Sequence, residues 1–171
     1  MTDQDIVKQI LAGDKTAFTQ LLEKYQRQIL VYCLRLLNFH QEDAQDAVSE
    51  TFLKVYVNLA GYNPSLKFSS WLYRIAHNES VNIISKKSKY QLKALDEVID
   101  TLPSEINFDK PRKADLEKIL SQLSVDDRNV LTLFYLQAKS LNEIGEILKM
   151  SDNSVAVKLS RARTRAKEFV K

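Results

Sequence analysis

The fold of the C-terminal part of this chain is decided by residues 140–169, which read SLNEIGEILKMSDNSVAVKLSRARTRAKEF. Ser140 and Glu143 have the spacing of a capping box, which marks the start of a short helix. A tight turn at residues 150–153 leads into a longer helix, from about Asn153 to Phe169. Apolar residues recur along this second helix at steps of four and three, at Val155, Leu159, Ala162, Ala166 and Phe169. This order of elements predicts a helix-turn-helix.

The final helix also has a polar, cationic face. This face lies about 100° from the apolar seam and carries Ser154, Lys158, Arg161 and Arg165. Lysine and arginine so placed can reach guanine edges or phosphates in a major groove. The small Gly145 on the first helix allows the two helices to approach closely. An ordinary helical hairpin with a solvated basic face is the alternative interpretation.

The composition restricts the class of protein. The chain has 171 residues, 44% of them hydrophobic and 27% charged, with a net charge of +3, three Gly, three Pro and one Cys. A single cysteine excludes an internal disulfide framework, and Cys33 is interpreted as a small buried side chain. The acidic start does not resemble a signal peptide, and no apolar run is long enough to span a bilayer. We therefore expect a cytoplasmic protein without stable membrane insertion.

Hydrophobic periodicity predicts an all-α fold of two small helical domains. In the first domain, residues 1–87, helices are expected at 3–12, 14–39, 41–60 and 67–87. Residues 88–113 contain two prolines and no sustained period, which is typical of a flexible linker. Residues 114–171 form the second domain, with four short helices. A capping box at Ser124 and Asp127 is expected to open the second of these helices.

Rings alternate with basic and amide side chains between residues 62 and 87. Rings can stack on unpaired bases, amides can bond base edges, and cations can follow phosphates. This segment is therefore a candidate for binding single-stranded nucleic acid, although aromatic residues at helical spacing are usually core. Phe68 is expected in the core. The candidate binding residues are Tyr62, Lys67, Trp71, Arg74, His77, Asn78, Lys86 and Lys87.

Asp43, Asp46 and Glu50 form an acidic stripe on the helix expected at 41–60. The stripe is either a solvated face or a docking surface for a basic partner. It has no histidine at ligand spacing, and His40 is expected to flank the start of the helix. We therefore predict no metal, no cofactor and no catalytic residues.

The two halves together resemble the extracytoplasmic-function (ECF) group of the sigma-70 family of bacterial RNA polymerase initiation factors. The residues that carry the resemblance are DAQDAVSETFLKVY at 43–56, FSSWLYRIAHN at 68–78, and the segments RNVL at 128–131, SLNEI at 140–144 and 155–163. The resemblance implies a region 2 that docks on the clamp coiled coil of core RNA polymerase and melts the −10 element. It also implies a region 4 that reads duplex DNA at −35 and contacts the polymerase flap. An anti-sigma factor is implied by the family alone.

The resemblance assigns roles to individual residues. Asn78 matches a position near the base extruded from the −10 strand, with the segment from Tyr62 to Lys67 lining or supporting its pocket. The chain departs from the family at Lys149, where Gly is common, and at Ala156 and Val157 in the recognition helix. Val157 therefore suggests apolar contact with thymine methyl groups. The polymerase contacts implied are Asp43, Asp46, Glu50, Phe52 and Lys54.

Two other classes of function are compatible with parts of the sequence. A free-standing helix-turn-helix repressor or activator would bind duplex tightly without polymerase. An enzyme acting on nucleic acid would need a metal or acid–base cluster, and the sequence has no convincing one.

Overall fold

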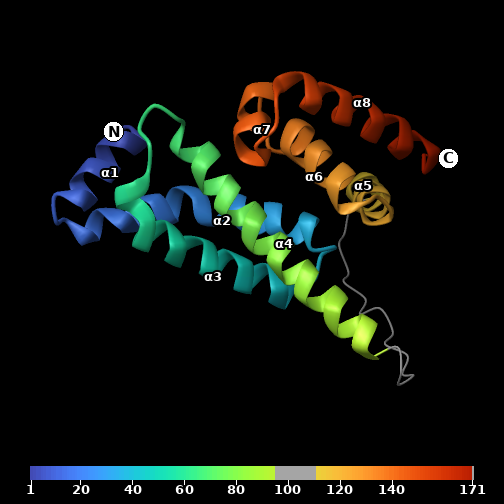
Figure 1. The fold of residues 1–171 in the computed structure, drawn as a ribbon, viewed down its shortest axis with the longest axis horizontal. Coiled ribbons are helices and arrows are strands. Elements are labelled where there is room, and N and C mark those ends of the chain that lie inside the picture. The colour runs from blue at the N-terminus through green and yellow to red at the C-terminus, as the bar shows by residue number, and fades with distance from the viewer. Residues whose placement is uncertain (95–110, 171) are drawn as a thin grey trace.

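The computed structural model describes residues 1–94 and 111–170, and every regular element within them is a helix (Figure 1). The all-α prediction is confirmed for these residues. The N-terminal half contains α1 (Asp3–Leu11), α2 (Phe18–Leu36), α3 (Gln41–Asn58) and α4 (Phe68–Ala94), with short 3-10 turns η1 (Lys15–Ala17) and η2 (Leu59–Gly61). The C-terminal half contains α5 (Pro111–Gln122), α6 (Val125–Leu131), η3 (Thr132–Leu136, a π-helix), α7 (Leu141–Leu148) and α8 (Asp152–Glu168). Within the described ranges, no helix is both long and apolar enough to cross a membrane.

The core of the N-terminal half lies between α2, α3 and α4, which pack on one another. Its buried side chains include Leu21, Ile29, Val55 and Leu72, each with no exposed surface. Burying such side chains contributes about 1.5–3 kcal/mol each. Phe68 and Cys33 are buried as predicted, and burial raises the pKa of the Cys33 thiol to about 12.

Helix caps explain several of the element boundaries. Asp14 caps η1, where its carboxylate accepts from the Thr16 amide at 3.0 Å. His40 is the N-cap of α3, which agrees with the expected flanking position. These local bonds satisfy amides that the first turn of a helix leaves without a partner.

The segment between the halves starts later than the periodicity predicted. Helix α4 continues past the expected end at Lys87 to Ala94, because neither glycine nor proline interrupts these residues. Helix α5 begins at Pro111, a residue that suits the first position of a helix. The rest of the predicted linker, residues 95–110, lies outside the described residues, so the domain limits at 87 and 114 stay predictions.

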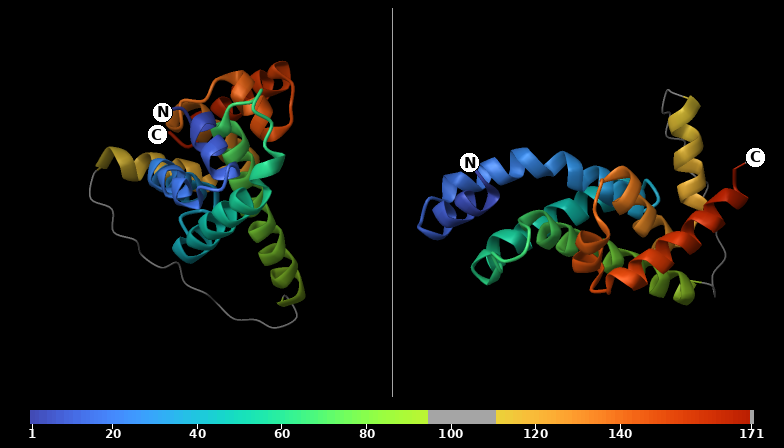
Figure 2. Two further views of the ribbon diagram at one scale, coloured as in Figure 1. Left: turned by 90° about the vertical axis from the view of Figure 1, so that its left-hand side faces the viewer. Right: turned by 90° about the horizontal axis from the view of Figure 1, so that it is seen from above.

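The two halves lie against each other. Helix α7 packs along α4, and α6 packs on α2, as the views in Figures 1 and 2 agree. No local sequence pattern predicts this arrangement. It matters for function because α4 and α8 carry most of the candidate nucleic-acid contacts.

Candidate nucleic-acid interface

The helix-turn-helix is built by capping at both of its helices. The Ser140 hydroxyl accepts from the Glu143 amide at 3.2 Å, and the Glu143 carboxylate accepts from the Ser140 amide at 2.9 Å. Ser151 caps α8 by accepting from the Ser154 amide at 3.2 Å. The predicted capping box and helix-turn-helix are therefore both present.

The turn between α7 and α8 requires two unusual backbone features. Lys149 ends α7 in the left-handed region, at φ +55°, where Gly is the usual residue. A Cβ on Gly145 would lie 2.6 Å from the carbonyl oxygen of Met150. The same Cβ would lie 3.3 Å from the carboxylate of Asp152, the first residue of α8, so Gly145 permits close approach both to the turn and to the start of the second helix.

Helix α8 has the predicted two-sided character. Val155, Leu159 and Ala162 are buried against the rest of the C-terminal half. Phe169 lies beyond the helix end and is 40% exposed, so the apolar seam stops before it. The adjacent polar face lines a groove together with α6, and the predicted −35 residues Ser154, Val157, Lys158, Arg161 and Arg165 all lie along it.

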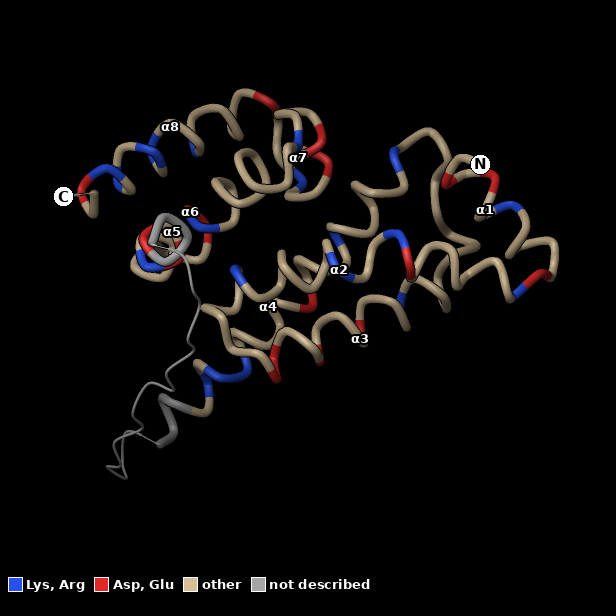
Figure 3. Tube along the Cα trace, turned by 180° about the vertical axis from the view of Figure 1, so that it is seen from behind, with Lys and Arg blue, Asp and Glu red and all other residues tan. Residues whose placement is uncertain are grey.

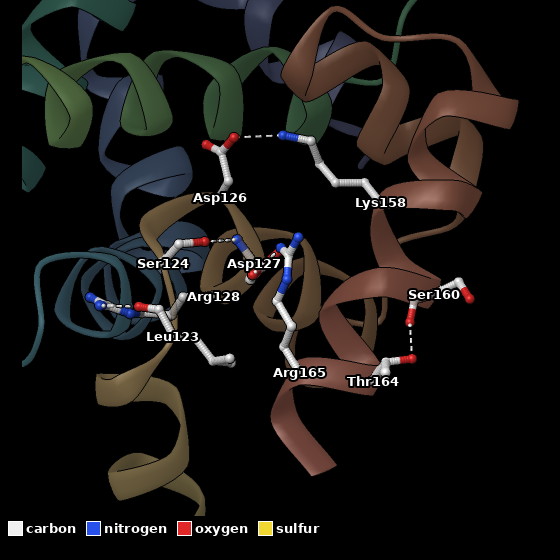
Figure 4. A network of polar contacts seen from close by, with 9 residues as sticks. All are labelled: Leu123, Ser124, Asp126, Asp127, Arg128, Lys158, Ser160, Thr164 and Arg165. Carbon is white, nitrogen blue, oxygen red and sulfur yellow. Dashed lines mark hydrogen bonds and ion pairs between the residues drawn. The ribbon is translucent and has the colours of Figure 1, made fainter. Parts of the chain in front are cut away.

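Two carboxylates of α6 pair with basic residues of this groove (Figure 4). Lys158 Nζ lies 2.6 Å from Asp126, which is largely exposed. Arg165 lies 2.6 Å from Asp127, whose side chain is only 4% exposed, and this hydrogen bond raises the pKa of Arg165. Local sequence patterns do not predict either pair, because each joins residues more than thirty positions apart.

The Asp127 pair also changes the expected cap of α6. Ser124 does accept from the Asp127 amide, at 3.2 Å. The reciprocal bond of the predicted capping box is not present at this helix start, because the Asp127 carboxylate contacts Arg165 instead.

The aromatic residues before and in α4 form a partly exposed cluster. Tyr62 is 7% exposed, and its hydroxyl donates to the Leu66 carbonyl at 2.6 Å. The Trp71 ring is half-buried between Tyr62 and Phe68, with ring centroids 5.4 and 5.9 Å away. The buried Tyr62 ring therefore packs against Trp71, and part of the Trp71 ring remains exposed, where a base could stack on it. Asn78, Lys86 and Lys87 are exposed.

Three of the candidate residues around α4 contact the C-terminal half. Lys67 Nζ lies 3.1 Å from Glu143, and Arg74 Nε donates to the Glu146 carbonyl at 2.9 Å. His77 Nδ1 lies 3.0 Å from Asn129 Nδ2. Burial at this contact lowers the pKa of His77, and the charge of Lys158 adds to this effect while Asp126 opposes it.

The acidic stripe lies on the outer face of α3, next to the basic end of α4 (Figure 3). Asp46 and Glu50 are exposed, whereas Asp43 pairs with Lys87. Lys54 pairs with Glu79 at 2.6 Å. Phe52 is 6% exposed in the core, so its side chain supports α3 from inside and is not available at the surface.

Two exposed apolar residues extend the same face of α3. Leu53 is 56% and Val57 69% exposed, at steps of three and four beyond Glu50. The sequence analysis did not single them out. Their signal was present in the sequence, since both occupy the helix face opposite the buried Val48 and Val55.

No group of three or more His, Cys, Asp or Glu in residues 1–94 and 111–170 is arranged to hold a metal ion. What the described residues do form is a basic groove on α8, an aromatic and basic face around α4, and an acidic stripe on α3.

Comparison with known proteins finds a matching protein family for each half of the chain. The family described as Sigma-70 region 2 matches residues 21–90, and the family described as Sigma-70, region 4 matches residues 113–165. The chain belongs to the sigma-70 family. This sigma factor is 33% identical to the ECF RNA polymerase sigma factor SigW of Bacillus subtilis, across 92% of this chain and 90% of SigW. It is 29% identical to the RNA polymerase sigma-H factor of Pseudomonas aeruginosa, across 94% and 90% of the two chains.

Solved structures share its fold. The sigma factor RpoE of Bartonella quintana, in complex with the anti-sigma factor NepR, superposes with a TM-score of 0.76 and 21% identity over 90% of this chain and 96% of RpoE. CnrH, in complex with the cytosolic domain of CnrY, superposes with a TM-score of 0.74 and 22% identity, over 98% and 96% of the two chains. This sigma factor is thus an ECF-type transcription initiation factor and not an enzyme. Of the three classes considered from the sequence, the first is confirmed.

Proposed function

We propose that this sigma factor directs promoter-specific initiation through three separate surfaces. Helix α8 reads the −35 duplex, the face of α4 with the preceding loop traps melted −10 DNA, and α3 docks on core RNA polymerase. The observation that carries the proposal is the two-sided α8, with a buried apolar seam and a basic groove beside it.

The duplex contact is supported by the chemistry of the groove. Lys158 and Arg161 supply donors for guanine edges or phosphates. Val157 is 51% exposed between polar neighbours, where it can pack on a thymine methyl group. Ser154 at the start of α8 can bond a phosphate or a base. Arg165 contributes positive charge near the C-terminal end of α8 while its guanidinium is hydrogen-bonded to Asp127.

The single-strand contact uses Trp71 as a stacking surface. Base–aromatic stacking contributes about 1–3 kcal/mol per base. Asn78 is exposed two turns further along α4, where its amide can bond the edge of an extruded base. The DNA backbone is contacted, or the pocket supported, by the basic side chains of this face, which are Lys67, Arg74, His77, Lys86 and Lys87. Tyr62 packs on Trp71 and holds its ring in place.

The polymerase contact combines charge with apolar surface. Asp43, Asp46 and Glu50 suit a basic partner surface such as the clamp coiled coil, with Lys54 at the edge of the stripe. Leu53 and Val57 add an apolar end to the same face. Phe52 is buried and supports α3 by packing in the core. The C-terminal half contacts the flap. We also propose that the protein works in the cytoplasm and is held there by an anti-sigma factor, as RpoE and CnrH are bound by partners in their complexes.

Transcription with purified core polymerase tests the proposal. Run-off products from genomic fragments identify a cognate promoter, and Lys158→Ala and Arg161→Ala are then compared with Lys15→Ala, an exposed lysine in the other half. Each groove variant is expected to cost about 1–3 kcal/mol if it reads a base. Normal promoter use by both groove variants would refute the assignment of α8.

A second measurement tests the −10 contact separately. The chain contains one tryptophan, Trp71, so its fluorescence reports stacking of an added base without labelling. A −10 non-template oligonucleotide should quench this signal in the holoenzyme, where the Trp71 signal is taken as the difference from a holoenzyme that carries Trp71→Phe. Asn78→Ala should weaken the quenching, and Asn58→Ala, on α3, should leave it unchanged.

A further inference from the structure

The loop that leads into α4 is hydrogen-bonded to the first helix of the chain. This loop covers residues 62–67 and belongs to the proposed −10 pocket. Gln4, in the first turn of α1, donates from its Nε2 to the Pro64 carbonyl in the middle of the loop, at 2.7 Å. Figure 1 shows the N-terminal helix beside this loop, although the two bonded residues are 60 positions apart in the sequence.

The other polar bonds of the loop stay within it. The Asn63 side chain accepts from the Ser65 amide at 2.9 Å and from the Ser65 hydroxyl at 2.8 Å, and the Leu66 amide donates to the Asn63 carbonyl at 3.1 Å. The Tyr62 hydroxyl donates to the Leu66 carbonyl at 2.6 Å. Such bonds determine the shape of a turn. Its placement on the protein depends on contacts from other elements, and Gln4 supplies one.

A second route leads from α1 to the aromatic cluster. The carboxylate of Asp3 accepts from the buried Tyr25 hydroxyl at 2.6 Å. Burial and this bond both raise the pKa of Tyr25, so its hydroxyl remains a donor. The Tyr25 ring lies 5.8 Å from Phe68, measured between ring centroids, and Phe68 lies 5.5 Å from Tyr62 and 5.9 Å from Trp71. Helix α1 therefore reaches the proposed stacking surface through packed rings.

Helix α1 is itself fixed to the protein. Its start is closed by a capping box between Thr2 and Asp5. Its apolar face is buried, and the side chains of that face are Ile6, Val7 and Ile10. A helix of this length is marginal alone, so this packing is what holds its first turn beside the loop. The residues that match Sigma-70 region 2 begin at 21, so the match assigns no role to α1.

We propose that Gln4 is a positioning residue for the −10 pocket and that α1 is a working part of that pocket. The Gln4 amide holds the loop in the place where the loop and Trp71 receive the extruded base together. A binding site of this kind loses selectivity when its parts move by a fraction of an ångström. This inference rests on the proposed −10 contact of α4 and deepens it.

A neutral variant of matched length tests the positioning role. Gln4→Met removes the donor and changes no charge, and Gln9→Met alters another exposed glutamine of α1 as the control. The holoenzyme is titrated with −10 non-template oligonucleotides of the cognate promoter that differ only in the extruded base. Their affinities are measured from the Trp71 signal, relative to a holoenzyme that carries Trp71→Phe.

The measured quantity is the ratio of affinities for the cognate and the altered base. Gln4→Met should lower this ratio by up to about tenfold, the factor that corresponds to one ordinary hydrogen bond. Gln9→Met should keep it. A purely structural α1 would change the folded fraction, which scales both affinities equally and leaves their ratio unchanged. An unchanged ratio in Gln4→Met would therefore overturn the inference.

Quenching by acrylamide in the free protein tests the placement of the loop without DNA. The chain has one tryptophan, so the signal belongs to Trp71 alone. Gln4→Met should increase the quenching, because Tyr62 and the loop are no longer held against the Trp71 ring, and Gln9→Met should not. Equal quenching in both variants would also overturn the inference. If the unsubstituted holoenzyme shows no preference for any base, the −10 assignment is wrong, and the quenching still decides whether α1 positions the loop.

Tyr25→Phe tests the second route in the same assay. It removes the hydroxyl that donates to Asp3 and keeps the ring that packs on Phe68. Quenching of Trp71 should increase in this variant as well. A Tyr25→Phe protein with the quenching of the unsubstituted protein would show that α1 does not act through the rings.

Discussion

Arg165 of α8 donates from one nitrogen to both carboxylate oxygens of Asp127 of α6, at distances of 2.6 and 2.9 Å. The Asp127 side chain is almost completely buried, whereas the Arg165 side chain is 55% exposed. The pair therefore fixes the end of the recognition helix to α6, while part of Arg165 still faces solvent. Lys158 and Asp126 repeat this relation two turns earlier, with the carboxylate exposed.

Arg165→Ala should lower the thermal midpoint of unfolding, because it leaves the buried Asp127 carboxylate without its cation. Arg161→Ala is the matched control, since the described residues show no ion pair for Arg161 and it is exposed on the same helix. Both variants should weaken promoter binding. Thermal unfolding followed by circular dichroism distinguishes them, and equal midpoints would show that the Asp127 pair is not structural.

Gly145→Ala should destabilise the C-terminal half by about 1–3 kcal/mol, as overpacking of a tight contact does. The added methyl group would lie 2.6 Å from the Met150 carbonyl oxygen, which belongs to the backbone and cannot rotate away. Gly61→Ala has no atom within 4 Å and serves as the control. Urea unfolding measures both, and an equally stable Gly145→Ala would contradict the geometry of the turn.

Lys149→Gly should stabilise the protein by about 1 kcal/mol, because a non-glycine residue in the left-handed region carries roughly that cost. Lys149 adopts φ +55° at the end of α7. Lys149→Ala, which removes the same side chain but keeps the Cβ, should show no such gain. Urea unfolding of the two variants separates backbone strain from loss of the lysine charge.

The contact between α4 and α6 should weaken in acid. His77 accepts from Asn129 of α6 when it is neutral, and burial at this contact lowers its pKa. A form in which α4 and α6 are apart therefore binds the proton more readily. The contact is fully stable above about pH 6.5, the ordinary pKa of histidine, and loses stability as the pH falls from there through the lowered pKa.

The radius of gyration between about pH 8 and about pH 5 measures this effect. The groups that face His77 are Asp126 of α6 and Lys158 of α8, besides Asn129. His77→Phe removes both the titration and the bond, so its radius should be larger at pH 8 and vary less with pH. A pH dependence that persists in His77→Phe would assign the effect to another group.

The apolar end of the α3 stripe should contribute to polymerase binding. Leu53→Ser/Val57→Ser should weaken the affinity for core polymerase without lowering the unfolding midpoint, because both side chains are more than half exposed. Leu11→Ser on α1, another exposed leucine, is the control. Competition for core polymerase measures the affinities, and equal affinity of all variants would limit the docking surface to the acidic residues.

Much of the site could be predicted from local sequence. Ser140 and Glu143 cap α7 as expected, because a capping box involves residues three positions apart. The seam of Val155, Leu159 and Ala162 was also correct, since helical periodicity depends on the chain alone. The errors occurred where a distant residue competes. Asp127 was expected to complete a cap and instead bonds Arg165, and Phe52, which the family resemblance implied as a polymerase contact, is packed in the core.

The order of its amino acids alone determined that this chain forms two sets of amphipathic helices with a basic helix-turn-helix at the end, because caps, turns and apolar spacing act over a few residues. Tertiary structure alone decided that Asn129 reaches both Tyr32 and His77, and that Lys67 and Arg74 contact α7. These partners are 52 to 97 positions apart in the sequence, so no local pattern predicts that they meet. Such contacts depend on how the finished helices pack, and no periodicity of 3.6 residues carries that information.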